Sequence, residues 1–338
     1  MILVTGGTGL LGSHILFQLV QNGERVKAIY RDSNSIQKVE KLFSYYTKDY
    51  QKLFQEITWV EADILDIPSL EEAFDTVTKV YHAAALISFN PKDWLTLRKN
   101  NVEGTKNIVN LCLDMNITKL CYASSTAAIG KSANNEEVTE DNEWVDSDLN
   151  VYAISKHLAE MEVWRGSQEG LDVVIVNPGI ILGPGNWNKG SSRLFKNAAK
   201  GMRSYFPGGT GFISANDVAT IMIKLMDSTI KNERYITIAK NLSYKEVFSM
   251  ISTSFGMPVP QKRIPFWLLE CLWRIDWFLS NLLGKKRKLT KSTVKSLQNT
   301  QEYSHKKIKE ALQYQFEDLK PGIDVTCKIL KEEYSEKF

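Results

Sequence analysis

The stretch Ile2-Leu3-Val4-Thr5-Gly6-Gly7-Thr8-Gly9-Leu10-Leu11-Gly12 near the start of the chain decides the fold class. Its apolar beginning predicts a short buried strand, and apolar residues at helical spacing from Leu11 to Val20 predict the helix that follows. The segment Arg25–Tyr30 predicts a second strand, which completes a βαβ unit. The three glycines lie between strand and helix, where glycine lets the backbone approach a pyrophosphate at a helix N-terminus. This turn therefore predicts a dinucleotide site.

Short apolar runs alternate with helical stretches as far as about residue 240. This alternation predicts an α/β fold, a Rossmann-type doubly wound parallel sheet that helices cover on both faces. We assign residues 1–178 to this domain, with about 213–240 completing it, and residues 179–212 and 241–338 to a smaller, mostly helical C-terminal substrate lobe. The further strands expected are Ile57–Val60, Lys79–His82, Lys119–Ala123, Val173–Val176 and Tyr235–Ile238. The further helices expected are Ser35–Gln55, Ser69–Phe74, Leu97–Met115, Tyr152–Ser167 and Val218–Met226, the last with Asp217 as N-cap.

The composition excludes several classes of protein. The 338 residues carry 42 Lys and Arg against 39 Asp and Glu with both signs interspersed, which is not the footprint of a nucleic-acid-binding protein. The four cysteines lie far apart and have no histidine at ligand spacing, so we expect neither a metal site nor a disulfide scaffold. Met1 precedes an apolar strand without a basic leader, and no run of about 18 uncharged apolar residues occurs. We therefore expect a soluble, cytoplasmic protein.

Tyr152 and Lys156 lie four residues apart and share one face of an expected helix. A tyrosine has a reference pKa of ~10, so it needs a nearby cation to exchange protons near neutrality. Lys156 supplies that cation. Upstream, Tyr122-Ala123-Ser124-Ser125-Thr126 ends an expected strand and places hydroxyl groups at the carboxyl edge of the sheet, where such folds bind ligands. These residues together predict proton transfer at that edge.

In combination and in chain order, these motifs resemble the extended branch of the short-chain dehydrogenase/reductase superfamily, the NAD-dependent epimerase/dehydratase family. The resemblance covers most of the chain. The apolar segment from Val173 to Gly185 is most similar to the dihydroflavonol-4-reductase and 3β-hydroxysteroid dehydrogenase-like subgroup. The further segments that resemble family motifs are Ala62-Asp63-Ile64, His82-Ala83-Ala84-Ala85, Asn101-Val102-Glu103-Gly104-Thr105, Ser124-Ser125 with Gly130, and Asn177-Pro178-Gly179.

The resemblance implies an NAD(P)-dependent enzyme with Ser125, Tyr152 and Lys156 as its catalytic residues. Tyr152 is the implied general acid or base, and Ser125 polarises the substrate carbonyl. Lys156 lowers the pKa of Tyr152 and holds the nicotinamide ribose. Together with the glycine turn, the residues expected to bind the cofactor are Gly6, Gly9, Leu10, Leu11, Gly12, Arg31, Ser33, Asp63, Ile64, Ala83, Ala84, Ala85, Asn101, Ser124, Tyr152, Lys156, Pro178 and Gly179.

The end of the second strand bears on the choice of cofactor. An acidic residue there commonly holds the ribose 2′-hydroxyl of NAD, whereas a cation accommodates the 2′-phosphate of NADP. The chain has Arg31 at this position and a further hydroxyl donor in Ser33, although Asp32 lies between them. We therefore expect NADP(H) in preference to NAD(H).

Ser125 is followed by Thr126-Ala127-Ala128, where sugar-nucleotide dehydratases of the family have an Asp-Glu pair, so dehydration is not expected. We expect hydride transfer between NADP(H) and a carbonyl or secondary alcohol of a fairly apolar small molecule. One alternative is a sugar-nucleotide epimerase of the same family, and another is a catalytically silent NADP-binding regulator. The resemblance also implies a homodimer that forms through helices near Asn101–Met115 and Tyr152–Ser167. Four tryptophans, Trp94, Trp144, Trp164 and Trp187, are expected to pack in the core or the lobe, and of these Trp187 is the best candidate for lining the substrate pocket.

The segment 265–288 combines an aromatic helix with the basic run Lys285-Lys286-Arg287-Lys288. As a helix it has one broad uncharged apolar arc, while Trp273 and Trp277 fall on its polar side. Core contact, a substrate lid or a protein partner would explain the arc. Amphipathic rings beside a basic run also suit peripheral contact with an anionic membrane. The arc consists of Trp267, Leu268, Cys271, Leu272, Ile275, Phe278, Leu279, Leu282 and Leu283.

Overall fold

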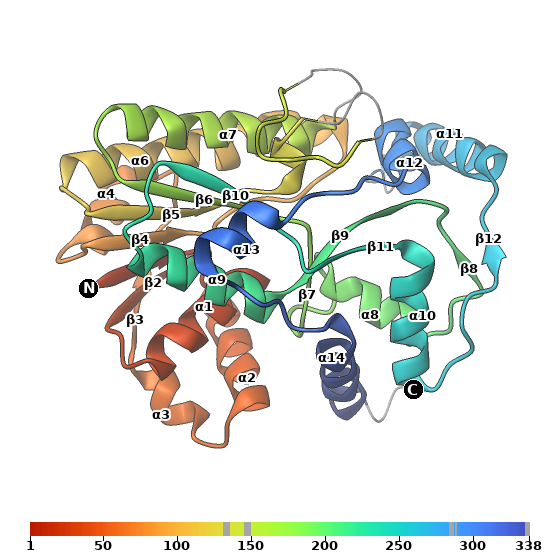
Figure 1. Cartoon of the computed structure of the whole chain (residues 1–338), viewed down its shortest axis with the longest axis horizontal. Coiled ribbons are helices and arrows are strands. Elements are labelled where there is room, and N and C mark those ends of the chain that lie inside the picture. The colour runs from red at the N-terminus through yellow and green to blue at the C-terminus, as the bar shows by residue number, and fades with distance from the viewer. Residues whose placement is uncertain (131–135, 145–149, 284–286, 288, 335–338) are drawn as a thin grey trace.

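Seven parallel strands form the central sheet of the protein (Figure 1). The computed structural model describes residues 1–130, 136–144, 150–283, 287 and 289–334. The strands are β1 (Ile2–Thr5), β2 (Val26–Tyr30), β3 (Ile57–Glu61), β4 (Lys79–His82), β5 (Lys119–Ala123), β6 (Val173–Pro178) and β10 (Glu233–Thr237). Their order, β3-β2-β1-β4-β5-β6-β10, is that of a doubly wound dinucleotide-binding sheet with a strand added beside β6. The predicted Rossmann-type fold is confirmed.

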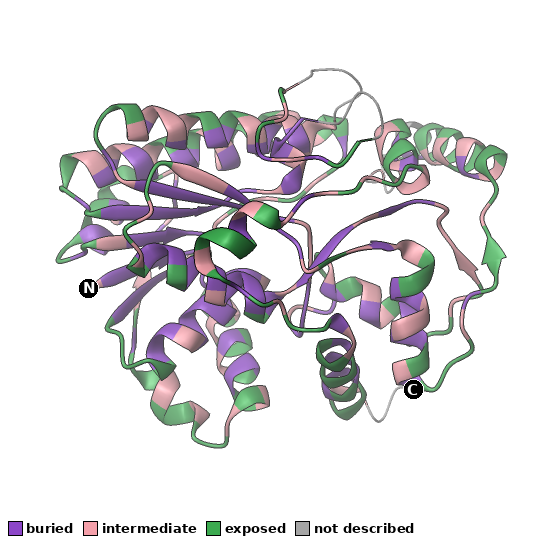
Figure 2. Ribbon diagram, viewed as in Figure 1, coloured by how far each residue is buried: buried purple, intermediate pink, exposed green. Residues whose placement is uncertain are grey.

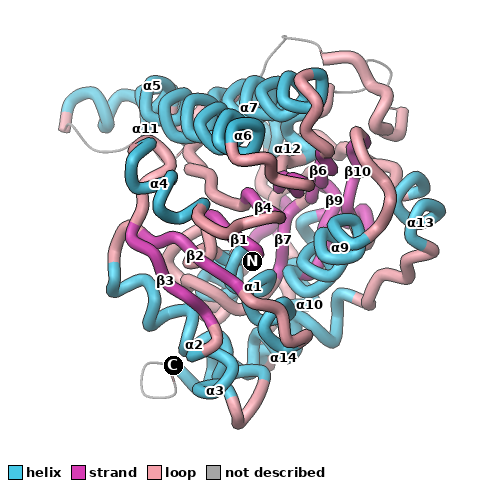
Figure 3. The backbone as a smooth tube through the Cα atoms, turned by 90° about the vertical axis from the view of Figure 1, so that its left-hand side faces the viewer, coloured by secondary structure: helices cyan, strands magenta, loops and turns pink. Residues whose placement is uncertain are grey.

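Two layers of helices cover this sheet (Figure 3). One layer consists of α4 (Ile67–Phe74), α6 (Gly104–Asp114) and α7 (Val151–Gln168), and the other of α1 (Leu10–Gln21) and α9 (Ala215–Asp227). A hydrophobic core lies on each face, and every residue of β1, β5 and β6 is buried (Figure 2). Burial on both faces explains why these strands are continuous apolar runs without alternation.

Shorter helices extend both layers. The helices α2 (Ile36–Tyr46) and α3 (Tyr50–Gln55) pack next to α1, while α5 (Trp94–Leu97) leads through a π-helical turn, Arg98–Glu103, into α6. The single helix expected over Ser35–Gln55 is therefore two, because the backbone at Thr47 is extended. The N-cap of α9 is Ser214, whose Oγ accepts from the Asp217 amide, so the expected cap at Asp217 is wrong. Asp217 instead accepts from the Tyr314 hydroxyl at 2.6 Å.

A smaller lobe is built from the segments that leave the main sheet. Its three-stranded sheet has the order β7-β9-β11, formed by β7 (Ile180–Leu182), β9 (Gly209–Ser214) and β11 (Lys240–Ser243). Its helices are α8 (Ser192–Ala198), α10 (Tyr244–Phe255), α11 (Phe266–Leu282), α12 (Lys291–Gln298), α13 (Lys306–Leu312) and α14 (Leu319–Glu333). Two short strands, β8 (Ser204–Tyr205) and β12 (Lys262–Arg263), pair beside them. In the described ranges, no helix is long and apolar enough to cross a membrane.

Trp187 lies in the hydrophobic core of this lobe. It is buried among residues such as Phe195 and Leu182, and its Nε1 donates to Glu333 Oε2 at 2.6 Å. Trp187 is therefore one of the expected packing residues of the lobe, and its contact with a substrate stays a prediction.

Candidate active site

The glycine turn between β1 and α1 has the shape that a pyrophosphate needs. Gly6 has a φ of +69°, and a Cβ atom there would lie 2.5 Å from the Ala84 nitrogen, so only glycine fits this turn. A Cβ on Gly12 would lie 2.1 Å from the Gly6 oxygen, so the start of α1 can pack this closely on the turn only with glycine at position 12. A Cβ on Gly9 would meet only the Gly6 oxygen, at 3.2 Å. The remaining side of Gly9 is open.

The N-terminus of α1 fits an anionic cofactor for a second reason. Its N-cap, Gly9, provides no side-chain cap, and the first turn of the helix contains no acidic residue. The free amides of Leu10, Leu11 and Gly12 and the positive end of the helix dipole can therefore face a phosphate group. The glycine turn and this helix end would hold the pyrophosphate of the NAD(P) cofactor.

The segment that follows β4 lies against the glycine turn. His82 ends the strand, and its ring nitrogens bond to Thr5 Oγ1 at 2.6 Å and to Thr105 Oγ1 at 3.0 Å. Burial lowers the pKa of His82 to about 3, so the ring is a neutral link between β1, β4 and α6. Ala83, Ala84 and Ala85 come next, and the backbone of the first two contacts Gly6. The structure thus places this expected cofactor segment beside the turn.

Tyr152 stands in the first turn of α7 and faces Ser125, which follows β5. Burial raises the pKa of Tyr152 to about 12, and the side chain of the neighbouring Ser125 acts in the opposite direction. Phe89 packs edge-on against the Tyr152 ring, with centroids 5.6 Å apart. Ser125 Oγ also accepts from the Ala127 amide at 3.2 Å, which fixes the rotamer of the serine. The fold thus brings two of the three predicted catalytic residues into contact.

Lys156 lies one helical turn after Tyr152 and is buried. Its Nζ donates to the Tyr122 hydroxyl at 2.6 Å and to the Ala123 carbonyl at 2.9 Å. An ammonium group has three donors, so one remains for a ligand or a water. Burial lowers the pKa of Lys156 to about 7, and the negative charge of Glu160 opposes this effect. The lysine is therefore held close to the midpoint of its titration at neutral pH.

Glu160, which belongs to none of the sequence motifs, lies one turn beyond Lys156 and is completely buried. Its Oε2 accepts from Ser124 Oγ at 2.5 Å and from Asn177 Nδ2 at 2.8 Å. Its Oε1 forms an ion pair with Arg234 Nη1 at 3.1 Å. The one carboxylate therefore ties α7 to β6, to β10 and to the end of β5. The signal in the sequence was its spacing of four and eight residues from Lys156 and Tyr152.

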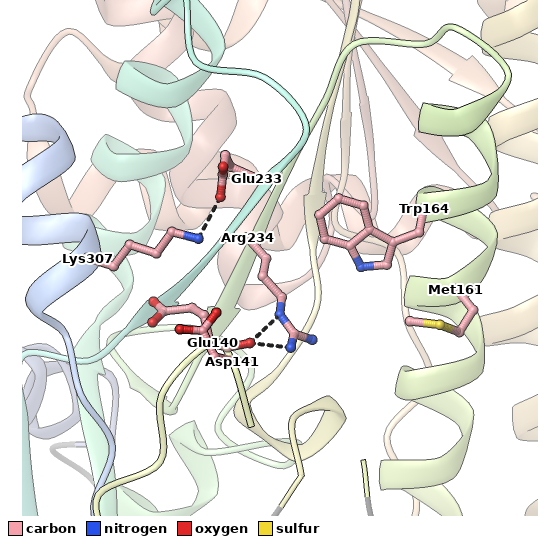
Figure 4. A pocket seen from close by; sticks show the side chains of 7 residues that line it. All are labelled: Glu140, Asp141, Met161, Trp164, Glu233, Arg234 and Lys307. Atoms are coloured by element: carbon pink, nitrogen blue, oxygen red, sulfur yellow. Dashed lines mark hydrogen bonds and ion pairs between the residues drawn. The ribbon is translucent and has the colours of Figure 1, made fainter. Parts of the chain in front are cut away.

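Arg234 reaches Glu160 from β10 and is held on its other side by the Glu140 carbonyl, which accepts from Nε at 2.9 Å and also from Nη2 (Figure 4). A pocket of about 440 Å³ opens beside the guanidinium. It is lined by Glu140, Asp141, Met161, Trp164, Glu233, Arg234 and Lys307. None of the predicted catalytic or cofactor residues lines it. This pocket gives Arg234 contact with solvent and is separate from the candidate active site.

Two residues expected to bind the cofactor use their side chains inside the protein. The Ser124 hydroxyl turns inward to Glu160. The Asn101 amide bonds to both backbone groups of Leu86, at 2.7 and 3.0 Å, and to Ser155 Oγ at 2.9 Å. Asn101 thereby anchors the segment after β4 to α7, from within the π-helical turn. Contact of either residue with the cofactor stays a prediction.

The remaining expected cofactor residues lie at the carboxyl ends of their strands. Asp63 and Ile64 follow β3, and the buried Ile64 packs on Gly104, where a Cβ would lie 2.5 Å from its Cδ1. Pro178 ends β6, and Gly179 follows it closely packed against Gly211. Because parallel strands share one carboxyl edge, these residues lie at the same edge as Ser125.

Arg31 follows β2 and is exposed. Its Nη1 lies 3.6 Å from Asp63 Oδ2 and 3.5 Å from Asn100 Oδ1, with 63% of the side chain accessible. Asp32 accepts from the backbone and side-chain nitrogens of Asn34, both at 3.0 Å, so a local turn occupies its carboxylate. Ser33 is exposed within that turn. The contacts with Asp63 and Asn100 are long and solvent-exposed, so they leave the guanidinium of Arg31 able to turn toward an anion.

The sequence model of the NAD dependent epimerase/dehydratase family matches residues 2–239, so the chain belongs to this family. It is an extended short-chain dehydrogenase/reductase-type oxidoreductase, as the fold and the motifs predicted. It is 29% identical over 268 residues to tetraketide alpha-pyrone reductase 2 of Arabidopsis thaliana, covering 75% of this chain and 82% of the relative. It is 28% identical over 273 residues to sterol demethylase protein B of Methylococcus capsulatus, covering 79% and 78% of the two chains. The crystal structure of gox2253 has the same fold, with a TM-score of 0.81, 24% identity and 98% of both chains covered.

Proposed function

We propose that the protein is an NADP(H)-dependent reductase that acts on a carbonyl group of a fairly apolar small molecule. The observation that carries this proposal is the placement of Tyr152 beside Ser125 at the carboxyl edge of the sheet, with the buried Lys156 one helical turn further along α7. When bound, NADPH supplies the hydride. The protein must then bind the carbonyl oxygen and deliver a proton to it.

Both Tyr152 and Ser125 act on the carbonyl oxygen of the substrate. The Ser125 hydroxyl donates a hydrogen bond to the carbonyl and polarises it, while Tyr152 transfers its phenolic proton as negative charge develops. The resulting tyrosinate is stabilised by the Lys156 ammonium and regains a proton from solvent. Protonated Tyr152 is the dominant form at neutral pH, because burial raises its pKa to about 12. Tyr152 therefore has, at neutral pH, the protonation state that reduction requires.

The surroundings of Tyr152 support an apolar substrate. Phe89 packs against its ring, and Phe89 and Ile87 expose 43% and 56% of their surface in the segment that follows β4. Neither residue carries a charge to recognise a sugar nucleotide. The relatives named for a tetraketide pyrone and a sterol fit this choice of substrate class.

A panel of aldehydes, aromatic and aliphatic ketones and sterols tests the proposal with NADPH and with NADH. Net oxidation of NADPH with formation of the alcohol supports the reductase. Turnover of a nucleotide sugar without net redox change would instead support the epimerase. Tight NADPH binding without turnover of any substrate would support the regulator.

The pH dependence of the two directions of reaction should differ. Reduction needs protonated Tyr152, which the raised pKa preserves, and also the Lys156 ammonium, which has a pKa of about 7. The reductive rate should therefore fall as the pH rises from 6 to 9, because Lys156 loses its charge. Oxidation of the alcohol needs the tyrosinate, so its rate should rise with pH across the same range. Initial rates at saturating cofactor measure both. A reductive rate that stays constant from pH 6 to pH 9 would contradict the role of the Lys156 ammonium.

The preference for NADPH should depend on Arg31. Arg31→Ala should weaken NADPH binding by about 1.5–3 kcal/mol, the range for hydrogen bonds to a charged group, and leave NADH within about twofold. Titration calorimetry with both cofactors measures the effect. Arg25→Ala, at the other end of β2, is the matched control and should change neither affinity. Equal losses for the two cofactors with Arg31→Ala would show that this residue does not bind the 2′-phosphate.

The assignment of domains stays a prediction, and so does the homodimer. Helices α6 and α7 pack side by side, and Met115, Leu158 and Met161 are exposed along them. These side chains are the apolar surface that a four-helix contact between two copies would cover.

A further inference from the structure

Helix α11 packs by its narrow polar side and presents its apolar side to solvent. Leu269 and Ser280 are buried, and Trp273 and Asp276 are half-buried, which defines a stripe at helical spacing. This stripe faces the region of α12, and Asp276 Oδ2 accepts from the Leu289 amide at 3.0 Å. Most of the apolar arc of the sequence is therefore exposed instead of packed in the core. Figures 1 and 2 show α11 at the outer edge of the lobe, largely exposed.

The exposed arc is large for a water-soluble surface. Eight large apolar side chains of the helix are each between 42% and 68% exposed, whereas Leu268 of the arc is half-buried. The exposed large apolar residues of the helix are Phe266, Trp267, Leu272, Ile275, Trp277, Phe278, Leu279 and Leu282. A contiguous patch of this kind on one helix marks an interaction surface, whereas single exposed apolar residues need no explanation.

Positive charge is concentrated around the same helix. Residues 262–295 contain nine Lys and Arg against two acidic residues, a net charge of +7 in a chain whose total is +3. The rest of the chain is therefore net negative. The basic run Lys285-Lys286-Arg287-Lys288 falls here, and only Arg287 of it belongs to the described residues. Both acidic residues are engaged, Glu270 with Arg274 at 2.5 Å and Asp276 with the Leu289 amide.

We propose that α11 lies in the surface of an anionic lipid bilayer, with its apolar arc among the acyl chains and the surrounding cations at the headgroups. Its 17 residues span about 25 Å parallel to the surface. Trp267 belongs to the uncharged arc and Trp277 lies beside it, and both are exposed, as amphipathic rings at a headgroup boundary would be.

The charge also selects this occupant over a second copy of the chain. A twofold interface brings the same patch of both copies together, so each net charge of +7 would face its equal. An anionic lipid surface instead attracts each cation by about 1 kcal/mol, within the Debye length. Apolar burial and charge attraction therefore act together only on the membrane.

The cysteines of the chain provide the probe for a test. Cys271 lies on the exposed arc and is itself exposed, whereas Cys112, Cys121 and Cys327 are buried. A thiol-reactive, polarity-sensitive fluorophore on the full chain should therefore attach at Cys271. With vesicles of phosphatidylcholine and phosphatidylglycerol at low salt, its emission should shift to the blue. The shift should decrease with pure phosphatidylcholine and at 0.5 M salt.

Two variants separate the apolar and the electrostatic contributions, and co-sedimentation with the same vesicles measures their affinity without a label. Ile275→Ser with Phe278→Ser, and replacement of the four cations 285–288 by Gln, should each weaken binding at least tenfold. Ile67→Ser with Val325→Ser is the matched control, because these residues are also about half exposed but lie elsewhere, and it should bind like the parent. Circular dichroism establishes that each variant is folded.

Absence of binding to anionic vesicles at low salt would overturn the proposal. So would binding that the two variants leave unchanged, or a dimer in solution that the double serine variant dissociates. None of these measurements depends on catalytic activity, so they stand apart from the proposed reductase.

Discussion

Tyr152→Phe should lower turnover by about 10²–10⁴-fold, the contribution expected of a positioned general acid. The substitution removes one oxygen and its proton, while the ring keeps its edge-on contact with Phe89. Affinity for NADPH should therefore change by no more than about twofold. Steady-state kinetics and cofactor titration measure the two quantities on the same preparation.

The outer helix α3 provides the control for this experiment. Tyr50→Phe removes the same hydroxyl from a tyrosine that packs at the edge of the core on the other side of the sheet, and it should leave turnover unchanged. Near-normal activity in Tyr152→Phe would show that the proton comes from another group.

The second large effect is expected at Glu160, through stability as well as activity. Glu160→Gln keeps the size of the side chain but leaves the Arg234 cation without its counter-ion, at a cost on the order of 3 kcal/mol in unfolding free energy. The solvent that reaches Arg234 through its pocket should keep the cost at the lower end of the range (Figure 4). Urea denaturation measures this loss.

Activity provides the readout that distinguishes positioning from stability alone. The Glu160 charge raises the pKa of Lys156, so Glu160→Gln should lower it further below about 7. Reductive turnover should then fall at neutral pH and recover partly as the pH decreases, because the ammonium re-forms. A folded variant with an unshifted pH profile would contradict a role for Glu160 at Lys156.

Two further variants test whether the loss of stability in Glu160→Gln comes from the buried, unpaired charge. Glu160→Gln combined with Arg234→Gln removes both charges and should regain part of the lost stability, since no unpaired charge stays buried. Glu162→Gln, two residues along the same helix, breaks the partly exposed pair with Arg165 and should cost no more than about 1 kcal/mol. Equal costs at positions 160 and 162 would contradict the importance of burial.

The main sheet and the positions of the candidate catalytic residues could be predicted because their signals are local. The glycine turn, the apolar strands and the Tyr152–Lys156 spacing each lie within one or two elements, and parallel strands bring their carboxyl ends to one edge. Arg234 could not be predicted in the same way. Its contact with Glu160 depends on β10 pairing with β6, and no periodicity along the chain determines which strand a distant segment joins.

Helix α11 shows a different limit. Helical periodicity gave an uncharged arc but not the partner of that arc, and the side that packs on the lobe proved to be the one with Asp276 and Ser280. Asp32 shows the same limit on a smaller scale. Beside Arg31 it obscured the choice of cofactor, yet its carboxylate is occupied by Asn34 in a turn that only the structure shows.

The late arrival of β10 has a consequence for synthesis of the protein. The chain makes β6, leaves the sheet to build part of the lobe, and returns with Glu233–Thr237 more than fifty residues later. Translation proceeds at about 5–20 residues per second, so Arg234 is synthesised several seconds after Glu160. During this time the edge of β6 has no neighbouring strand and Glu160 has no counter-ion. A nascent chain that ends after β6 exposes both an unpaired strand edge and an unpaired carboxylate, which is the form that chaperones bind and proteases remove. The ribosome-bound intermediate, more than the finished enzyme, is where this fold is vulnerable.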